Sequence, residues 1–130
     1  MKRVFFLVSL FLIIACSSDN ESDKVEEVVL EPITSEVLYF IYTADTGNNS
    51  SKLEYQIKFI NPNNQDINGF VRITINADGL VSSLIGSDKS QCYFIAKNDE
   101  CIFTFEAEDS HDLGKVNNIE LVSLEYILEQ

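Results

Sequence analysis

The middle of the chain alternates apolar and polar residues with a period of two. In its clearest run, Leu53, Tyr55, Ile57 and Phe59 are separated by Glu54, Gln56 and Lys58. Every second side chain of a β-strand lies on the same face of the sheet, so this run predicts a strand with one buried face. An amphipathic helix would instead need apolar residues three and four positions apart. The pattern therefore limits the chain to a fold built mainly from β-strands.

Other strand-like runs follow one another with turn residues between them. We expect strands near residues 37–42, 53–59, 71–75, 80–85, 92–94, 101–105 and 119–128. The first is apolar at every position, which predicts burial on both faces. The last has two interpretations, because Leu121 and Leu124 also fit one face of a helix. About seven short strands at this spacing predict an all-β, two-sheet sandwich over residues 33–130.

Two segments carry a resemblance to a known class of domain. Residues 55–62 read Tyr-Gln-Ile-Lys-Phe-Ile-Asn-Pro, and residues 69–73 read Gly-Phe-Val-Arg-Ile. Together they resemble the immunoglobulin-like modules of bacterial envelope proteins. The resemblance implies an immunoglobulin-like β-sandwich of about seven strands. It implies no particular activity, because such sandwiches serve many functions.

The N-terminal segment has the features of an export signal. Lys2 and Arg3 precede the uncharged stretch Val4–Ile14, and Ala15–Cys16 follows it. Eleven residues are too few to span a bilayer as a helix, which needs about 20, but they fit the apolar part of a signal peptide. The order of these parts resembles the lipobox of bacterial lipoproteins. A buried core helix, or an ordinary secretory signal cut elsewhere, is the alternative.

The lipobox resemblance implies how the protein is attached to a membrane. Residues 1–15 would be removed and Cys16 would carry the lipid, so that the chain is anchored without spanning the bilayer. Acidic residues directly after Cys16 resemble the surface-export signals of some Bacteroidota lipoproteins. The expected location is therefore the cell envelope, at the outer membrane, facing the periplasm or the surface.

Residues 16–32 are expected to form an acidic tether. Ser17–Asp23 contains no hydrophobic residue, so it has nothing to bury and is predicted to be flexible. Val25–Leu30 offers an alternative, because these residues could begin a first strand that Pro32 would end.

The charge of the chain excludes one large class of partners. The formal net charge is −12, with 21 acidic and nine basic residues, and cleavage before Cys16 would also remove Lys2 and Arg3. Nucleic-acid binding needs clustered basic residues, so no nucleic-acid partner is expected. The acidity serves solubility in the simplest interpretation. Alternatively, it attracts a basic partner protein.

Cys92 and Cys101 form an even pair in a chain expected to be exported. An oxidising compartment favours a disulfide between them, and two buried free thiols are the alternative. Their spacing is too wide for a Cys-x-x-Cys redox site. Asn98 and Asp99 favour a turn between them. We therefore expect a hairpin in which Cys92 lies opposite Cys101 and Phe94, a core candidate, lies opposite Asp99.

The sequence contains no recognisable catalytic arrangement. His111 is the only histidine, and its neighbours Ser110 and Asp112 cannot form a relay with it, because adjacent side chains project in different directions. A calcium site could draw oxygen ligands from this acidic region, although the spacing matches no EF-hand; its candidates are Glu106, Glu108, Asp109 and Asp112. We predict no catalytic residue, no metal site, no cofactor and no enzymatic activity.

Three functions remain compatible with these features. The first is a lipid-anchored binding or structural module that presents its sandwich to a protein or glycan, with Tyr42 or Tyr93 as exposed anchors. These tyrosines could equally pack in the core. The second is an accessory or inhibitor lipoprotein that docks a basic partner. The third is a small hydrolase, which would require separated acidic residues to converge in a pocket.

Overall fold

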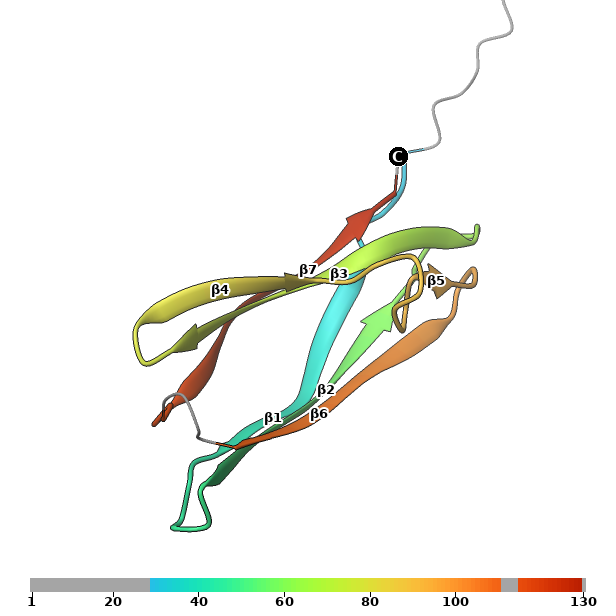
Figure 1. Cartoon of the computed structure of the whole chain (residues 1–130). Helices are drawn as coiled ribbons and strands as arrows, with labels where there is room; N and C mark the ends of the chain where they lie inside the picture. Colours follow the sequence, from blue (N-terminus) through green and yellow to red (C-terminus); the bar gives the residue numbers. More distant parts are fainter. Residues whose placement is uncertain (1–28, 111–114, 130) are drawn as a thin grey trace, which may run out of the picture.

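The computed structural model describes residues 29–110 and 115–129, and these form an all-β sandwich (Figure 1). The predicted sandwich of seven strands is confirmed. The strands are β1 (Thr34–Thr43), β2 (Ser50–Ile60), β3 (Ile67–Ala77), β4 (Leu80–Ile85), β5 (Phe94–Ile95), β6 (Glu100–Ser110) and β7 (Ile119–Leu128).

The strands form two antiparallel sheets. One sheet has the order β1-β2-β6. In the other, β3 is central, with β7 along one edge and β4 and the short β5 along the other edge. These orders match strands A-B-E and C′-C-F of immunoglobulin sandwiches. The chain crosses from one sheet to the other between β2 and β3 (Figure 1).

The core lies between the central strands, β2 and β3. Tyr55, Ile57 and Phe59 on β2 are almost completely buried, as are Val71 and Ile73 on β3. This is the alternation that the sequence predicted for both strands. The ring of Tyr55 also stacks on its neighbours within the same sheet, at centroid distances of 5.5 Å from Phe40 and 4.8 Å from Phe105.

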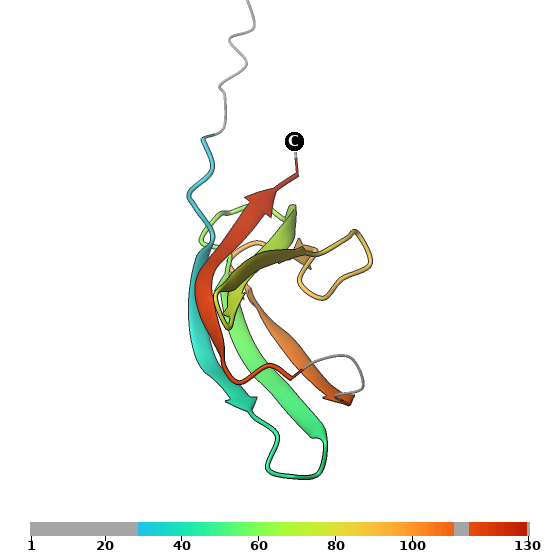
Figure 2. The same cartoon turned by 60° about the vertical axis from the view of Figure 1, so that its left-hand side comes forward.

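The prediction that the first strand is buried on both faces is wrong. Val37, Leu38, Tyr39 and Ile41 of β1 are all exposed. In the part of the chain that the structure describes, β1 is an edge strand that pairs only with β2, and its register shifts between Val37 and Tyr39. β7 lies beside β1 at the sandwich edge (Figure 2) and contacts it, but covers it incompletely. Val29 and Leu30, the described part of the alternative first strand over residues 25–30, are not in a strand, and its other residues lie outside the described residues.

A β-bulge explains the ambiguous pattern of residues 119–128. The segment is a strand, β7, whose pairing with β3 shifts between Thr74 and Ile75. Thr74 pairs with Ser123 and Ile75 pairs with Leu121, so Val122 is the extra residue. The extra residue places Leu121 and Leu124 on the same core-facing side, although they are three positions apart. The bulge therefore imitates a helical spacing in the sequence.

The disulfide between Cys92 and Cys101 is present, with Cα atoms 5.6 Å apart, but the predicted hairpin around it is wrong. Cys101 lies in β6 and pairs with Phe59 of β2. Phe94 instead pairs with Asn68 of β3, in the other sheet. Cys92 has a φ of 61°, and this left-handed conformation turns the chain just before β5. The bridge therefore joins the two sheets.

Phe94 is likewise not a core residue, since 56 % of it is exposed. Its neighbour Ile95 occupies the inward position opposite Ile67 and is buried. Phe94 therefore lies on the outer face of the sheet, because adjacent residues in a strand alternate between faces.

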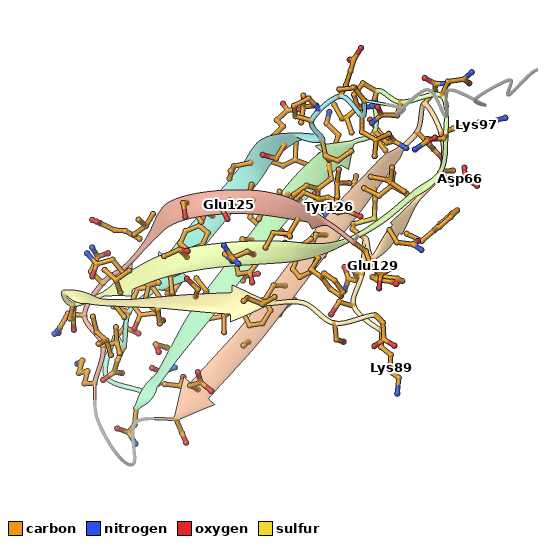
Figure 3. All side chains as sticks on the ribbon, turned by 90° about the horizontal axis from the view of Figure 1, so that it is seen from above. Asp66, Lys89, Lys97, Glu125, Tyr126 and Glu129 are labelled. Atoms are coloured by element: carbon orange, nitrogen blue, oxygen red, sulfur yellow. A yellow bond between two sulfur atoms is a disulfide. The ribbon has the colours of Figure 1, made fainter. Side chains whose placement is uncertain are left out.

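Two buried asparagines organise the end of the sandwich where the described chain begins. The Asn61 amide nitrogen donates to the carbonyl oxygens of Gln65 (2.9 Å) and Ala96 (3.0 Å), and its Oδ1 accepts from the Asn63 backbone (2.9 Å). Asn63 binds both backbone groups of Glu31, accepting from its N–H (2.7 Å) and donating to its carbonyl (3.0 Å). The last residues of the expected tether are thus attached to the domain. At this same end, the Asp66 carboxylate accepts a hydrogen bond from the Lys97 backbone (2.9 Å; Figure 3).

Candidate partner-binding groove

One side of the sandwich is open between β4 and β6. Within the described chain, β4 pairs only with β3 and β6 only with β2. A cavity of about 190 Å³ lies between the two edges. Its apolar lining includes Tyr55, Val71, Ile73, Leu84, Phe103 and Phe105. Of these residues, Leu84 is exposed and Phe103 and Phe105 are partly buried, so the cavity can be reached from this side.

A second cavity, of about 290 Å³, lies between the sheets near the start of β7. Its apolar lining includes Leu53, Ile75, Phe105, Ala107, Val116 and Ile119. Phe105 borders both cavities, so they adjoin each other along β6. We call the two cavities together the inter-sheet groove. Polar side chains also line the second cavity, among them Ser51 and Asp109.

β4 forms an apolar rim of the groove. The strand reads Leu-Val-Ser-Ser-Leu-Ile and carries no charge. Leu80 is 73 % exposed and Ile85 59 %, and Val81 and Leu84 are also exposed. Natural sheet edges are usually protected by a charged residue, a proline or a covering segment. An uncovered apolar edge of this kind marks a surface that another chain can bind.

The opposite rim, β6, is partly covered by a side chain. The Gln91 amide nitrogen donates to the carbonyl of Thr104 (3.2 Å), and the Gln91 Oε1 accepts from the Thr104 backbone N–H (2.9 Å). The N–H and carbonyl of Thr104 both point away from β2, towards the free edge of β6. One carboxamide thus satisfies both of these backbone groups, as a peptide group of a neighbouring strand would. Along an antiparallel strand, successive residues direct their N–H and carbonyl groups alternately towards one neighbouring strand and towards the opposite edge. Glu106 and Glu108 therefore also direct their backbone groups away from β2.

The outer face beside this part of β6 is acidic. Lys52 forms ion pairs with Glu106 (2.7 Å) and Glu54 (3.0 Å). The hydrogen bonds that Lys52 donates to these carboxylates, first of all that to Glu106, raise the pKa of Lys52. Among the described residues, the Glu108 carboxylate accepts a hydrogen bond from the neutral hydroxyl of Ser50 alone, at 2.7 Å. Two carboxylates therefore contact the Lys52 ammonium group and a third, Glu108, lies opposite Lys52 in the neighbouring strand, so the region keeps a negative charge.

The two tyrosines expected as exposed anchors are both engaged within the protein. Tyr42 lines the groove and donates its hydroxyl to the carbonyl of Val116 (2.7 Å). The Tyr93 hydroxyl binds the carboxylate of Glu129, and this bond raises the pKa of Tyr93. Tyr93 also packs against Phe70, with ring centroids 5.5 Å apart. Neither hydroxyl is thus free to serve as the predicted anchor.

The candidate calcium ligands are not brought together. Glu106 and Glu108 project from the outer face of β6, whereas Asp109 lines the groove on the other face. Asp112 and His111 lie outside the described residues, as does Cys16. Within residues 29–110 and 115–129, no group of three or more His, Cys, Asp or Glu side chains could hold a metal ion. The same residues include no helix with the length and hydropathy needed to cross a membrane.

The groove was not predicted from the sequence. Its lining residues are the inward positions of well-predicted strands, which in a closed sandwich would all be core. The one available signal was the absence of charge in residues 80–85, an unusual feature for an edge strand. The contact between Gln91 and Thr104 depends on a loop conformation that no local pattern indicates.

Comparison of the chain with protein-family models, with curated proteins and with solved structures finds no match.

Proposed function

We propose that this protein is a lipid-anchored binding module of the cell envelope that holds a partner polypeptide at the inter-sheet groove. The observation that carries the proposal is the open side of the sandwich. There the uncharged, exposed strand β4 faces the partly buried rings of Phe103 and Phe105. A protein partner that covers these side chains gains free energy by removing apolar surface from water.

The expected lipid on Cys16 would present the groove away from the membrane. The described chain begins at Val29, beside Pro62 and Asn63 at one end of the sandwich. The second cavity is lined by residues at the end of β1 and the start of β2, among them Tyr42 and Ser51. Figure 1 shows the β1–β2 turn at the other end of the sandwich from the start of β1. A tether that enters at the first end therefore leaves the groove accessible to partners. Intact mass of the protein from its native host tests this anchor: we expect loss of residues 1–15 and added acyl mass.

Site-specific photo-crosslinking tests the groove. A photoreactive amino acid at Leu84, which is exposed on β4, should capture a defined protein from the native envelope. The matched control position is Ser123, which is exposed on β7. Leu84→Glu should abolish capture by a crosslinker at Leu80, which lies on the same face of β4, whereas Ser123→Glu should not. Equal capture from positions 84 and 123, or capture that survives Leu84→Glu, would contradict the proposal.

A basic partner is the second candidate, and the charge around Lys52 favours it. In this region the negative charges outnumber the positive charge of Lys52, because three carboxylates lie there: Glu54, Glu106 and Glu108. Attraction between such a surface and a basic segment is screened by salt. Capture that falls steeply between low and physiological ionic strength would support a basic partner.

A further inference from the structure

We infer that the partner binds as an added β-strand along β6, next to Gln91, and that its sequence alternates basic and apolar residues. This inference rests on the proposed function, because it describes how the inter-sheet groove is filled. It adds the binding mode and the chemistry of the segment that is recognised.

The first step concerns the backbone of β6. Gln91 already occupies the outward N–H and carbonyl of Thr104 in the manner of a strand neighbour. The next outward-facing backbone groups belong to Glu106 and Glu108. Among the described residues, no group hydrogen-bonds to the backbone of either residue on this side. An added strand would therefore begin where the Gln91 carboxamide ends.

The second step concerns the fold. In immunoglobulin sandwiches with four strands in this sheet, strand D pairs with strand E along the edge that corresponds to the free edge of β6. Here residues 29–110 and 115–129 contribute three strands to the sheet, β1-β2-β6. The segment between β4 and β5 approaches this edge but contributes the side chain of Gln91 and no strand. The position of the fourth strand is thus open beyond Thr104.

The third step concerns the side chains of the added strand. Those on its inner face would enter the groove beside Phe105 and Ala107, where an apolar side chain fits. Those on its outer face would lie next to Glu106 and Glu108, where a lysine or arginine is favoured by charge. Because faces alternate along a strand, the two requirements predict a period-two sequence of basic and apolar residues.

The test uses the purified protein as its native host processes it, labelled with ¹⁵N, and three synthetic peptides. The probe is an acetylated and amidated (Lys-Val)₃ peptide. The controls are (Glu-Val)₃, which reverses the charge, and a Lys₃-Val₃ block peptide, which keeps composition and charge but removes the alternation. With saturating (Lys-Val)₃, we expect the backbone amides of Glu106 and Glu108 to exchange with solvent roughly tenfold more slowly. Neither control should have this effect.

A charge variant sharpens the test. Glu106→Gln with Glu108→Gln should weaken binding of (Lys-Val)₃ roughly fivefold. The matched control combines Glu120→Gln with Glu36→Gln, because Glu36 forms a comparable ion pair with Lys58 (2.7 Å) at the other edge of the sheet. This control should leave binding unchanged. Equal binding of (Lys-Val)₃ and (Glu-Val)₃, or equal loss in both variants, would overturn the predicted charge pattern.

The failure of the inference can be distinguished from the failure of the proposed function. If (Lys-Val)₃ shifts the resonances of Leu84 and Ile85 but leaves the Glu106 and Glu108 amides unprotected, the groove binds peptide without strand addition and the inference is wrong. If the peptide perturbs neither β4 nor β6 and no crosslink forms from Leu84, the proposed function fails as well.

Discussion

Cys92 and Cys101 are joined across the two sheets, with their Cα atoms 5.6 Å apart. Cys92 is buried in the segment before β5, whereas Cys101 lies in β6. The bridge therefore ties this segment to the edge of β6. Gln91 directly precedes Cys92, so the disulfide also holds the carboxamide that covers Thr104. One covalent bond thus supports both the fold and one rim of the groove.

We predict that loss of this disulfide destabilises the protein by roughly 2.5–3 kcal/mol, the chain-entropy value for a loop of about ten residues. Cys92→Ser, Cys101→Ser and the double variant should lose similar amounts of stability, because each removes the same bridge. Urea unfolding of the three variants, compared with the oxidised protein, provides the measurement. A double variant as stable as the oxidised protein would refute a stabilising role for the bridge.

Gln91→Ala should uncover the outward backbone groups of Thr104. We expect a loss of about 1 kcal/mol, typical of hydrogen bonds at an accessible site, and faster exchange of the Thr104 amide. Gln56→Ala is the matched control, because Gln56 binds only the side-chain hydroxyl of Thr104 (3.3 Å). Hydrogen exchange followed by NMR separates the two variants. Equal exchange rates at Thr104 would mean that Gln91 does not protect this edge.

Asn61→Ala should be among the more destabilising single substitutions outside the apolar core. The Asn61 side chain is fully buried, and its loss would leave the carbonyls of Gln65 and Ala96 without their donor. Leaving a buried polar group without a hydrogen-bond partner costs about 1–3 kcal/mol. The control Asn64→Ala removes an exposed amide with one long contact to Asn98 (3.4 Å) and should cost less than about 0.5 kcal/mol. Thermal or urea unfolding of both variants measures the difference, and similar losses would contradict this role for Asn61.

The positions of most strands could be predicted because apolar and polar residues alternate along each of them, and the apolar residues form one buried face. β2 and β3 follow this rule, so Tyr55, Ile57, Phe59, Val71 and Ile73 were found from sequence, whereas the buried Ile67 at the start of β3 was not. The burial of β1 was predicted wrongly because its apolar residues lie at an incompletely covered edge of the sandwich. β7 was ambiguous because a bulge at Val122 shifts the alternation by one residue. Local patterns thus predicted the existence of strands more reliably than their place in the sandwich.

Strand partners and the groove could not be predicted for a different reason. Phe94 and Cys101 are close in sequence and flank a turn, which favoured a hairpin between their strands. In the structure they belong to different sheets, since Phe94 pairs with Asn68 and Cys101 with Phe59. Local turn residues do not determine which distant strand each segment meets. The groove depends on this choice, because it lies where, within the described chain, one edge of β4 and one edge of β6 have no strand partner.

The contact between Glu31 and Asn63 should account for the effect of shortening the tether. A chain that starts at Ile33 lacks both hydrogen bonds to the Asn63 side chain, and we expect a loss of about 1 kcal/mol relative to a chain that starts at Cys16. Asn63→Ala should cost more in the longer chain than in the shorter one, because only the longer chain contains the contact. Urea unfolding of the four proteins gives this double-mutant cycle. An equal cost of Asn63→Ala in both chains would show that the contact adds no stability.

Asp45 should make the β1–β2 turn sensitive to acid. Its Oδ1 accepts hydrogen bonds from the backbone N–H groups of Gly47 (2.8 Å) and Asn49 (3.0 Å), and Lys115 binds its Oδ2 (3.0 Å). The bond from Gly47, followed by that from Lys115, lowers the pKa of Asp45 from 3.8 to about 2. Because the pKa is lower in the folded state, the contribution of Asp45 to stability is complete above about pH 4 and is lost as the pH falls towards 2.

Asp45→Asn removes this titration, so the difference in unfolding free energy between the two proteins should narrow between pH 4 and pH 2. Urea unfolding at several pH values measures the difference directly. Lys115→Met is the informative companion variant: since the Gly47 hydrogen bond is the largest cause of the shift, the carboxyl resonance of Asp45 should still titrate below its usual range. A difference between wild type and Asp45→Asn that stays constant from pH 5 to pH 2 would mean that the turn does not depend on the ionised carboxylate.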